Sequence, residues 1–197
     1  MSWIAHGPAE GTYSPHGSNN LLSMNGTHSE ITFWQNRNNF TNYFQGIHLV
    51  SLNLTGEGID EFGNFHAPEY SNLSIFYSLG YDLDLLNFIH IQPYFSYGIG
   101  NVKYRKNYRD STGLEKYYNE HNETADWGIY GLNFIFEITG KFWIGYGFNY
   151  YLEKQNIEYN RNRSEINLEK SHSVLLVWNW ERVKIKTINP RESWSFR

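Results

Sequence analysis

The sequence predicts an all-β fold, an antiparallel up-and-down transmembrane β-barrel of about eight strands. Three observations lead to this prediction. Apolar residues alternate with small or polar ones along most of the chain, short turns alternate with long polar connections, and 18% of the residues are aromatic while only 18% are charged. Alternation with a period of two is typical of strands. Aromatic-rich outer faces, with short and long connections sorted to opposite ends, are typical of barrels that cross a membrane.

The N-terminal part of the chain gives the weakest strand signal. Residues 1–27 are rich in Gly, Pro and Ser, and their alternation is irregular. They form either the first strand, with residues 2–10 as the candidate, or a periplasmic extension. Clear strands follow at residues 30–35 and 43–55. In the second of these the apolar residues change parity after Leu49, and a β-bulge there would reconcile the two halves.

Two hairpins and a final strand complete the pattern. Residues 72–81 and 89–100 alternate on either side of a short turn, and so do residues 130–138 and 142–152. The last strand is expected at residues 172–183. These make seven strands, and because single-chain bacterial barrels have an even number, the N-terminal segment is expected to supply the eighth. The clear barrel is assigned to residues 28–187, and residues 188–197 to a C-terminal tail.

The two faces of the strands indicate which one meets lipid. Between residues 142 and 152, one face carries Phe142, Ile144 and Tyr146, while the opposite face is largely Gly and Asn. Small polar residues suit the crowded interior of a narrow barrel, whereas a water-facing surface normally carries mixed charge. The apolar face is therefore expected to point outward. The alternative is a soluble, lipocalin-like carrier whose apolar face lines a cavity for a small apolar ligand.

Charge and composition exclude several kinds of function. The net charge of −4 and the pI of about 6.0 do not suit a phosphate backbone, so nucleic acid is not an expected partner. The chain has no cysteine and therefore no disulfide, thiolate nucleophile or cysteine-ligated zinc. No apolar run is long enough for a transmembrane helix. Residues 1–6 lack the basic and apolar regions of a signal peptide, so we expect a native signal peptide to have been removed.

Glycine–aromatic sequences accompany this architecture, as in Tyr97-Gly98-Ile99-Gly100 and Gly145-Tyr146-Gly147-Phe148. From about residue 30 to residue 183 the chain resembles the small eight-stranded outer-membrane barrels as a class, which includes the OmpA transmembrane domain, OmpX, OmpW and the lipid A-modifying barrels. The resemblance rests on architecture and on no family-specific motif. Such proteins often end in Phe, whereas here Phe196 is followed by Arg197. The resemblance implies a location in the bacterial outer membrane, among lipid and lipopolysaccharide.

Two groups of residues are candidates for chemistry inside or beside the barrel. Glu30, Glu137 and Glu181 lie on the expected inward face, where a carboxylate is costly unless it is paired. An ion-pair network with Arg or Lys in the lumen is favoured over a proton or ion site. His172 and Ser173 combine a base with a hydroxyl, but adjacent strand residues point to opposite faces, so a catalytic dyad is not favoured. The histidines show no metal-ligand spacing, and no metal or cofactor is predicted.

The charged stretch 103–123 is the candidate binding surface. Tyrosines mixed with both signs of charge suit contacts with a protein or with lipopolysaccharide. The alternative, which the usual composition of loops favours, is an ordinary solvated extracellular loop. The residues assigned to this surface are Tyr104, Arg105, Lys106, Tyr108, Arg109, Tyr117 and Tyr118.

A non-enzymatic role is favoured for the protein. The barrel would be structural, or it would bind or adhere through long extracellular loops. One form of this role is that of an accessory subunit in an envelope complex, with another envelope or surface protein as a further partner. The alternatives are a lipid A-modifying enzyme and the soluble carrier. Side chains fill the lumen of an eight-stranded barrel, so a diffusive porin is not expected.

Overall fold

The computed structural model describes residues 1–36, 42–85, 88–113, 116–152, 154–159 and 162–178, with the backbone alone described at 36, 116–119, 154–159 and 162–164. These residues contain no helix that is long and apolar enough to cross a membrane. The strands are β1 Ser2–Ser14, β2 Leu22–Asn36, β3 Tyr43–Gly56, β4 Gly58–Ile59, β5 Phe65–Tyr81, β6 Leu83–Asp84, β7 Ile89–Arg109, β8 Lys116–Glu137, β9 Phe142–Tyr151, β10 Lys154–Tyr159 and β11 Asn162–Trp178.

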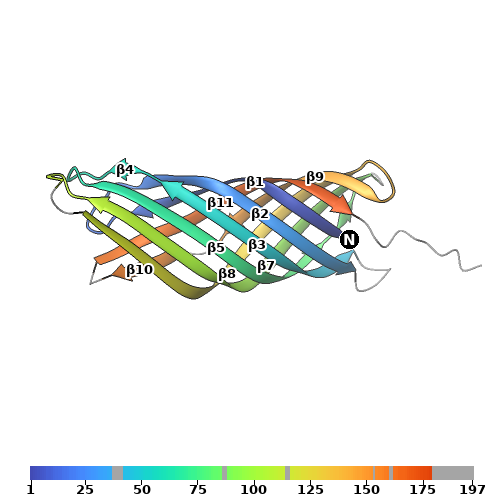
Figure 1. The fold of residues 1–197 in the computed structure, drawn as a ribbon. Coiled ribbons are helices and arrows are strands. Elements are labelled where there is room, and N and C mark those ends of the chain that lie inside the picture. The colour runs from blue at the N-terminus through green and yellow to red at the C-terminus, as the bar shows by residue number, and fades with distance from the viewer. Residues whose placement is uncertain (37–41, 86–87, 114–115, 153, 160–161, 179–197) are drawn as a thin grey trace, which may run out of the picture.

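Eight long antiparallel strands close into a barrel (Figure 1). The ring runs β1, β2, β3, β5, β7, β8, β9 and β11, and β1 closes it by pairing with both β2 and β11. Ser2 lies opposite Phe33 on one side and Trp178 on the other. The short β4 and β6 extend hairpins, and β10 pairs with β11. The N-terminal segment therefore contributes a barrel strand, one of the two alternatives for residues 1–27, while residues 179–197 lie outside the described part.

The two ends of the barrel differ. Met1 and Trp178 lie at the end that also holds the connections between β2 and β3, β5 and β7, and β8 and β9; we call it the turn end. The opposite end, which we call the hairpin end, holds the tips of the β1–β2, β3–β5, β7–β8 and β10–β11 hairpins. In Figure 1 the N-terminus marks the turn end, and β4 and β10 mark the hairpin end.

The outer wall near the turn end is apolar. Side chains such as Ile75 and Ile99 are 48% and 55% exposed, although both are large and apolar. We call this surface the apolar belt; its members are Ile4, Ile31, Phe33, Ile47, Leu49, Leu73, Ile75, Tyr77, Leu79, Phe95, Tyr97, Ile99, Tyr130, Phe136, Phe142, Ile144, Tyr146, Val174, Leu176 and Trp178. The predicted transmembrane barrel, with its apolar face outward, is confirmed. The soluble-carrier alternative is wrong, because it required that face to line a cavity.

Beyond the belt the polarity of the wall is inverted. Along β3 the outward residues change from Ile47 and Leu49 to Ser51, Asn53 and Thr55. The inward residues become apolar at the same height, where Val50, Leu52 and Leu54 are fully buried. The register of β3 with β2 and β5 runs without a shift. The β-bulge predicted near Leu49 is therefore wrong, since the change of parity marks a change of solvent outside the wall.

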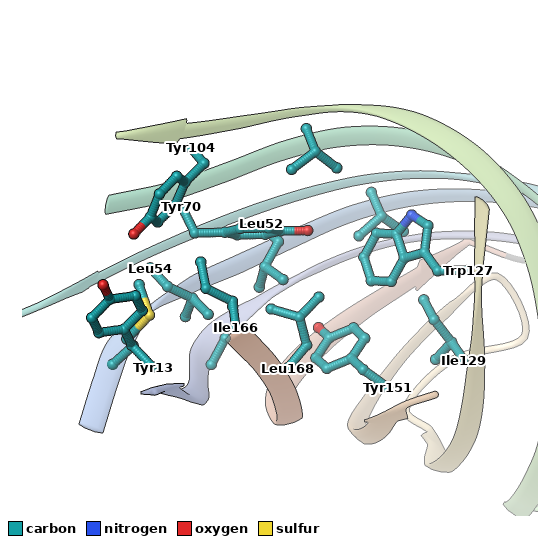
Figure 2. Close-up of a cluster of buried hydrophobic side chains, with 14 of the residues drawn as sticks. Tyr13, Leu52, Leu54, Tyr70, Tyr104, Trp127, Ile129, Tyr151, Ile166 and Leu168 are labelled. Carbon is teal, nitrogen blue, oxygen red and sulfur yellow. The ribbon is translucent and has the colours of Figure 1, made fainter. Parts of the chain in front are cut away.

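An apolar core fills the barrel at the hairpin end. Figure 2 shows its side chains converging from most of the strands. The core consists of Ala9, Tyr13, Met24, Val50, Leu52, Leu54, Tyr70, Phe76, Val102, Tyr104, Trp127, Ile129, Tyr151, Ile166 and Leu168. Large apolar side chains of the described residues therefore occupy the lumen at this end.

Three stretches that read as long polar loops are mostly strand. The long polar connections expected from the sequence fall at residues 56–70, 105–124 and 154–170. β5 begins at Phe65, β7 continues to Arg109 and β8 begins at Lys116, so the first two are connections only at their tips. Likewise β10 and β11 occupy most of the described part of 154–170. These strands look polar because their outward residues face water. About 9–11 residues are enough to cross a membrane as a tilted strand, so β7 and β8, with 21 and 22 residues, extend well beyond it.

Candidate functional site

Glu30 lies at the centre of a polar cluster inside the barrel. It is 97% buried, as its predicted inward position requires. Its Oε1 accepts hydrogen bonds from Trp3 Nε1, at 3.1 Å, and from the Thr32 hydroxyl, while Oε2 lies 3.2 Å from His28 Nε2. His48 Nδ1 approaches Oε1 to 2.7 Å, within ion-pair range but off the direction of a hydrogen bond. The described partners of Glu30 are therefore histidines, a Trp and a Thr, rather than the expected Lys or Arg.

The cluster continues across the lumen to the opposite wall. The Tyr151 hydroxyl lies 2.8 Å from His28 Nδ1 and donates to Ser171 Oγ at 2.9 Å. The Tyr94 hydroxyl donates to Asn149 Oδ1 at 2.6 Å. Leaving any of these buried groups without a partner would cost about 1–3 kcal/mol. The network thus joins β1, β2, β3, β7, β9 and β11, and it fixes the interior of the barrel.

Of the other two predicted lumen carboxylates, the structure describes the position of one. Glu137 has the inward parity but lies half-buried at the end of β8, opposite Trp143. Glu181 lies outside the described residues.

His172 and Ser173 point to opposite sides of β11. His172 lies on the outer wall, where its Nδ1 hydrogen-bonds the Tyr146 hydroxyl and its ring meets Phe148 edge-on at 5.1 Å. Ser173 is buried inside the barrel, and its hydroxyl has no hydrogen-bond partner among the described residues. The two side chains cannot act on one substrate atom, as the alternation of strand residues predicts.

The predicted binding residues of β7 are divided between the two faces of the strand. Arg105 and Arg109 point outward and are exposed to solvent. Tyr104 and Lys106 are 2% and 7% exposed and point into the barrel, and Tyr108 is half-buried on the same side. The side chains of Tyr117 and Tyr118 lie outside the described residues, although both belong to β8. The outer wall and the interior of the hairpin end therefore form two separate sites.

On the outer wall, a ladder of charges crosses three strands just beyond the apolar belt. Arg105 Nε donates to Glu120 Oε2 at 3.1 Å, and its Nη1 lies 3.9 Å from Glu69 Oε2. Lys103 Nζ lies 2.6 Å from Glu120 Oε1. Asn53, Thr55 and Ser71 complete the rim of an adjoining hollow of about 340 Å³. Exposed ion pairs contribute little stability, so this ladder adds little to the stability of the barrel.

The interior site at the hairpin end centres on Asp60, which the sequence did not single out. Asp60 Oδ1 accepts the backbone N–H groups of Phe62 and Asn64, at 2.9 and 2.8 Å. Asp60 Oδ2 lies 2.9 Å from His66 Nε2. Gly63, with φ of +81°, makes the turn between them. The sequence signal was an Asp followed by Gly and Asn, which is typical of a side-chain-capped turn.

Lys106 completes this interior site. Its Nζ lies 5.4 Å from the centre of the Tyr13 ring and 5.7 Å from that of Tyr108, within cation–π range. Burial lowers the pKa of Lys106 to about 8, against the opposing charge of Asp60. Burial also lowers the pKa of His66, which the hydrogen bond to Asp60 opposes and the charge of Lys106 reinforces. Burial by itself raises the pKa of Asp60, but the hydrogen bonds from His66, Asn64 and Phe62 outweigh it and lower the pKa to about 2.

A closed ring of eight antiparallel strands, with an outward apolar belt and a packed interior, defines a small transmembrane β-barrel of the outer-membrane type. The described residues contain no group of three or more His, Asp and Glu side chains placed to hold a metal ion. No protein-family model and no curated protein matches the chain in sequence.

Several solved outer-membrane barrels are similar to the chain in structure. The attachment invasion locus protein Ail of Yersinia pestis, solved in complex with the heparin analogue sucrose octasulfate, has 11% sequence identity and a TM-score of 0.42, over 90% of this chain and 96% of that one. Neisserial surface protein A has 13% identity and a TM-score of 0.44, over 89% and 96%. The outer membrane protease OmpT of Escherichia coli has 10% identity and a TM-score of 0.42, over 90% and 96%.

Proposed function

We propose that this chain is a bacterial outer-membrane protein that binds or adheres, without catalysis, through its hairpin end. The observation that carries the proposal is the inverted polarity beyond the apolar belt. A wall that is polar outside and apolar inside is stable only in water, so the barrel stands out of the membrane as a folded platform. The described core packs the lumen of the hairpin end with large apolar side chains, which favours surface binding over transport.

The hairpin end is the extracellular end in this proposal. Outer-membrane barrels have short turns on the periplasmic side and longer segments outside, and the turn end holds the short connections and Met1. The belt contacts lipid, and an apolar hollow of about 520 Å³ between Ile31, Phe142 and Leu176 opens on it. The ladder of Lys103, Arg105, Glu69 and Glu120 lies at the height of the outer-leaflet headgroups, where lipopolysaccharide is the expected neighbour.

A truncation of the β7–β8 hairpin tests the proposal. Val102 and Glu123 are paired across the two strands, so residues 103–122 can be replaced by Asn-Gly, which favours a two-residue hairpin turn. Cells of a Gram-negative host that display the wild-type chain are expected to aggregate and to attach to a surface, and cells that display the truncated chain to lose both properties. Lys141→Gln, in the turn at the opposite end, is the control.

The result is interpreted only when the variant is folded, which a mobility shift between boiled and unboiled samples in SDS electrophoresis reports. Equal adhesion by a folded, truncated barrel would contradict the proposal. A changed lipid A profile that disappears in Ser173→Ala or His172→Ala would instead establish the enzymatic alternative.

A further inference from the structure

The wall of the barrel is not continuous at the hairpin end. The ladder between β8 and β9 ends where Ile129 pairs with Tyr151, followed by a last hydrogen bond from Leu152 N to Gly128 O at 3.0 Å. From Trp127 back to Lys116, β8 pairs with β7 alone, and β10 pairs with β11 alone. Among the described residues, no strand covers this edge of β8. Figure 1 shows β8 and β10 as separate strands near this end.

The free backbone groups of this edge can be identified. The carbonyl of Gly128 points away from β7, because it accepts Leu152 N on the β9 side. In an antiparallel strand the N–H and C=O of one residue point to the same edge, and successive residues alternate. Asn122, Thr124 and Asp126 therefore direct both groups to the free edge, whereas Glu123 and Ala125 direct theirs to β7. The side chains of Asn122, Thr124 and Asp126 are also exposed.

The chemistry of the edge selects a kind of partner. Natural edge strands are usually blunted by Lys, Pro or a bulge, but residues 120–128 contain neither residue and show no register shift. They carry three carboxylates, Glu120, Glu123 and Asp126, against one imidazole, His121. Glu120 lies against Lys103, and Glu123 Oε2 lies 3.2 Å from His121 Nε2, so the carboxylates already attract cations.

We propose that the free edge of β8 from Asn122 to Asp126 binds an extended segment of another protein that carries Lys or Arg, as an additional strand. Main-chain hydrogen bonds to a sheet edge provide affinity, and side-chain chemistry provides specificity. The inference rests on the proposed function in one respect, that the hairpin end faces the outside of the cell.

The test uses the full chain refolded in detergent micelles and a ten-residue peptide of alternating Lys and Val, with a Glu–Val peptide as the charge control. Hydrogen exchange of single amides is followed by NMR. In the free protein, the amides of Asn122, Thr124 and Asp126 are expected to exchange at least tenfold faster than those of Glu123 and Ala125. The Lys–Val peptide is expected to slow the first set at least tenfold, and the Glu–Val peptide to leave it unchanged.

A matched pair of variants separates backbone pairing from simple charge attraction. Thr124→Pro removes one N–H at the free edge and none from the β7 ladder, so the Lys–Val peptide should bind at least tenfold more weakly. Thr124→Val keeps the N–H and should bind as the wild type does. The mobility shift on boiling shows that both variants fold.

Four results would overturn the inference. Slow exchange of Asn122, Thr124 and Asp126 in the free protein would mean that β10 closes over the edge. Protection that rises with protein concentration would mean that a second copy occupies it. Equal binding of the two peptides would mean that charge does not select the partner. Unchanged binding by Thr124→Pro would mean that the peptide does not pair with β8 as an added strand. None of these results decides the proposed function, because the truncation experiment tests adhesion through residues 103–122 as a whole.

Discussion

At the scale of single residues, Asp60 and His66 organise the tip of one hairpin. Four described groups of Phe62, Asn64 and His66 bind the Asp60 carboxylate. The His66 ring packs between the rings of Tyr13 and Tyr108, at centroid distances of 5.9 and 5.3 Å. His66 Nδ1 is buried without a hydrogen-bond partner among the described residues. Buried groups held in one protonation state make the stability of the hairpin depend on pH.

The tip is expected to loosen in two steps as pH falls. His66 has a pKa below 6.5 in the folded tip. Below about pH 6.5 the unfolded tip therefore binds a proton that the folded tip does not bind, and the stability of the tip falls as pH decreases. Folded Asp60 has a pKa of about 2 against an ordinary 3.8, so its contribution is complete above 3.8 and is lost as pH falls to 2. Hydrogen exchange of the Phe62 and Asn64 amides, corrected for the intrinsic effect of pH, measures both steps. His66→Gln should abolish the first step alone, and an unchanged profile in that variant would contradict the assignment.

The partners of Glu30 illustrate the limit of sequence reasoning at this scale. The inward position of Glu30 follows from strand alternation, and so does that of His28 two residues earlier. The contacts with Trp3, on β1, and His48, on β3, depend on register and on how the barrel closes. No local pattern reports those quantities, so the sequence suggested Lys or Arg partners instead.

At the scale of elements, Gly131 shows how side-chain size is matched across neighbouring strands. Gly131 on β8 is paired with Tyr94 on β7, and a Cβ atom at Gly131 would lie 2.0 Å from the Tyr94 ring. The ring cannot move freely, because its hydroxyl is held by Asn149. The alternation of small and large residues along β8 is therefore a packing requirement as well as a strand signal.

Gly131→Ala is expected to destabilise the barrel by about 1–3 kcal/mol, the usual cost of overpacking. Gly140→Ala is the matched control, since a Cβ atom there meets nothing within 4 Å. Reversible urea unfolding in lipid vesicles gives both free energies. If the two variants unfold at the same urea concentration, Tyr94 does not occupy the space beside Gly131.

At the scale of the whole molecule, the two surroundings of the outer wall, lipid and water, determine which residues the wall carries. Outer-membrane barrels carry an apolar band about 25 Å tall, and the apolar belt supplies it from Leu73 to Leu79 on β5. Beyond it, Ser71 and Glu69 follow on the same outward face. Inside the barrel, the Glu30 cluster and a smaller apolar cluster that includes Trp3, Phe44 and Val177 lie toward the turn end, and the larger apolar core fills the hairpin end.

This arrangement predicts that one substitution has different effects at two heights. Ile75→Arg places a charge in the belt and should cost about 2–4 kcal/mol in lipid vesicles, if Ile75 lies near the midplane. Asn101→Arg, on the neighbouring strand just beyond the belt, should change the free energy of unfolding by less than about 0.5 kcal/mol. Similar costs for the two variants would contradict the position of the belt.

The sequence by itself determined the strand class, the outward direction of the apolar face and the inward position of Glu30, because a period of two assigns every side chain in a strand to one of two faces. Only the tertiary structure decided where the membrane ends. An apolar side chain avoids water equally well against lipid and in a packed core, so the sequence does not distinguish the two positions. For this reason the sequence of the strands beyond the belt resembles polar loops, and the change of parity after Leu49 resembles a bulge. Closure decided the rest, since the Glu30 cluster, the Asp60–Lys106 site and the free edge of β8 all depend on which strands become neighbours across the barrel.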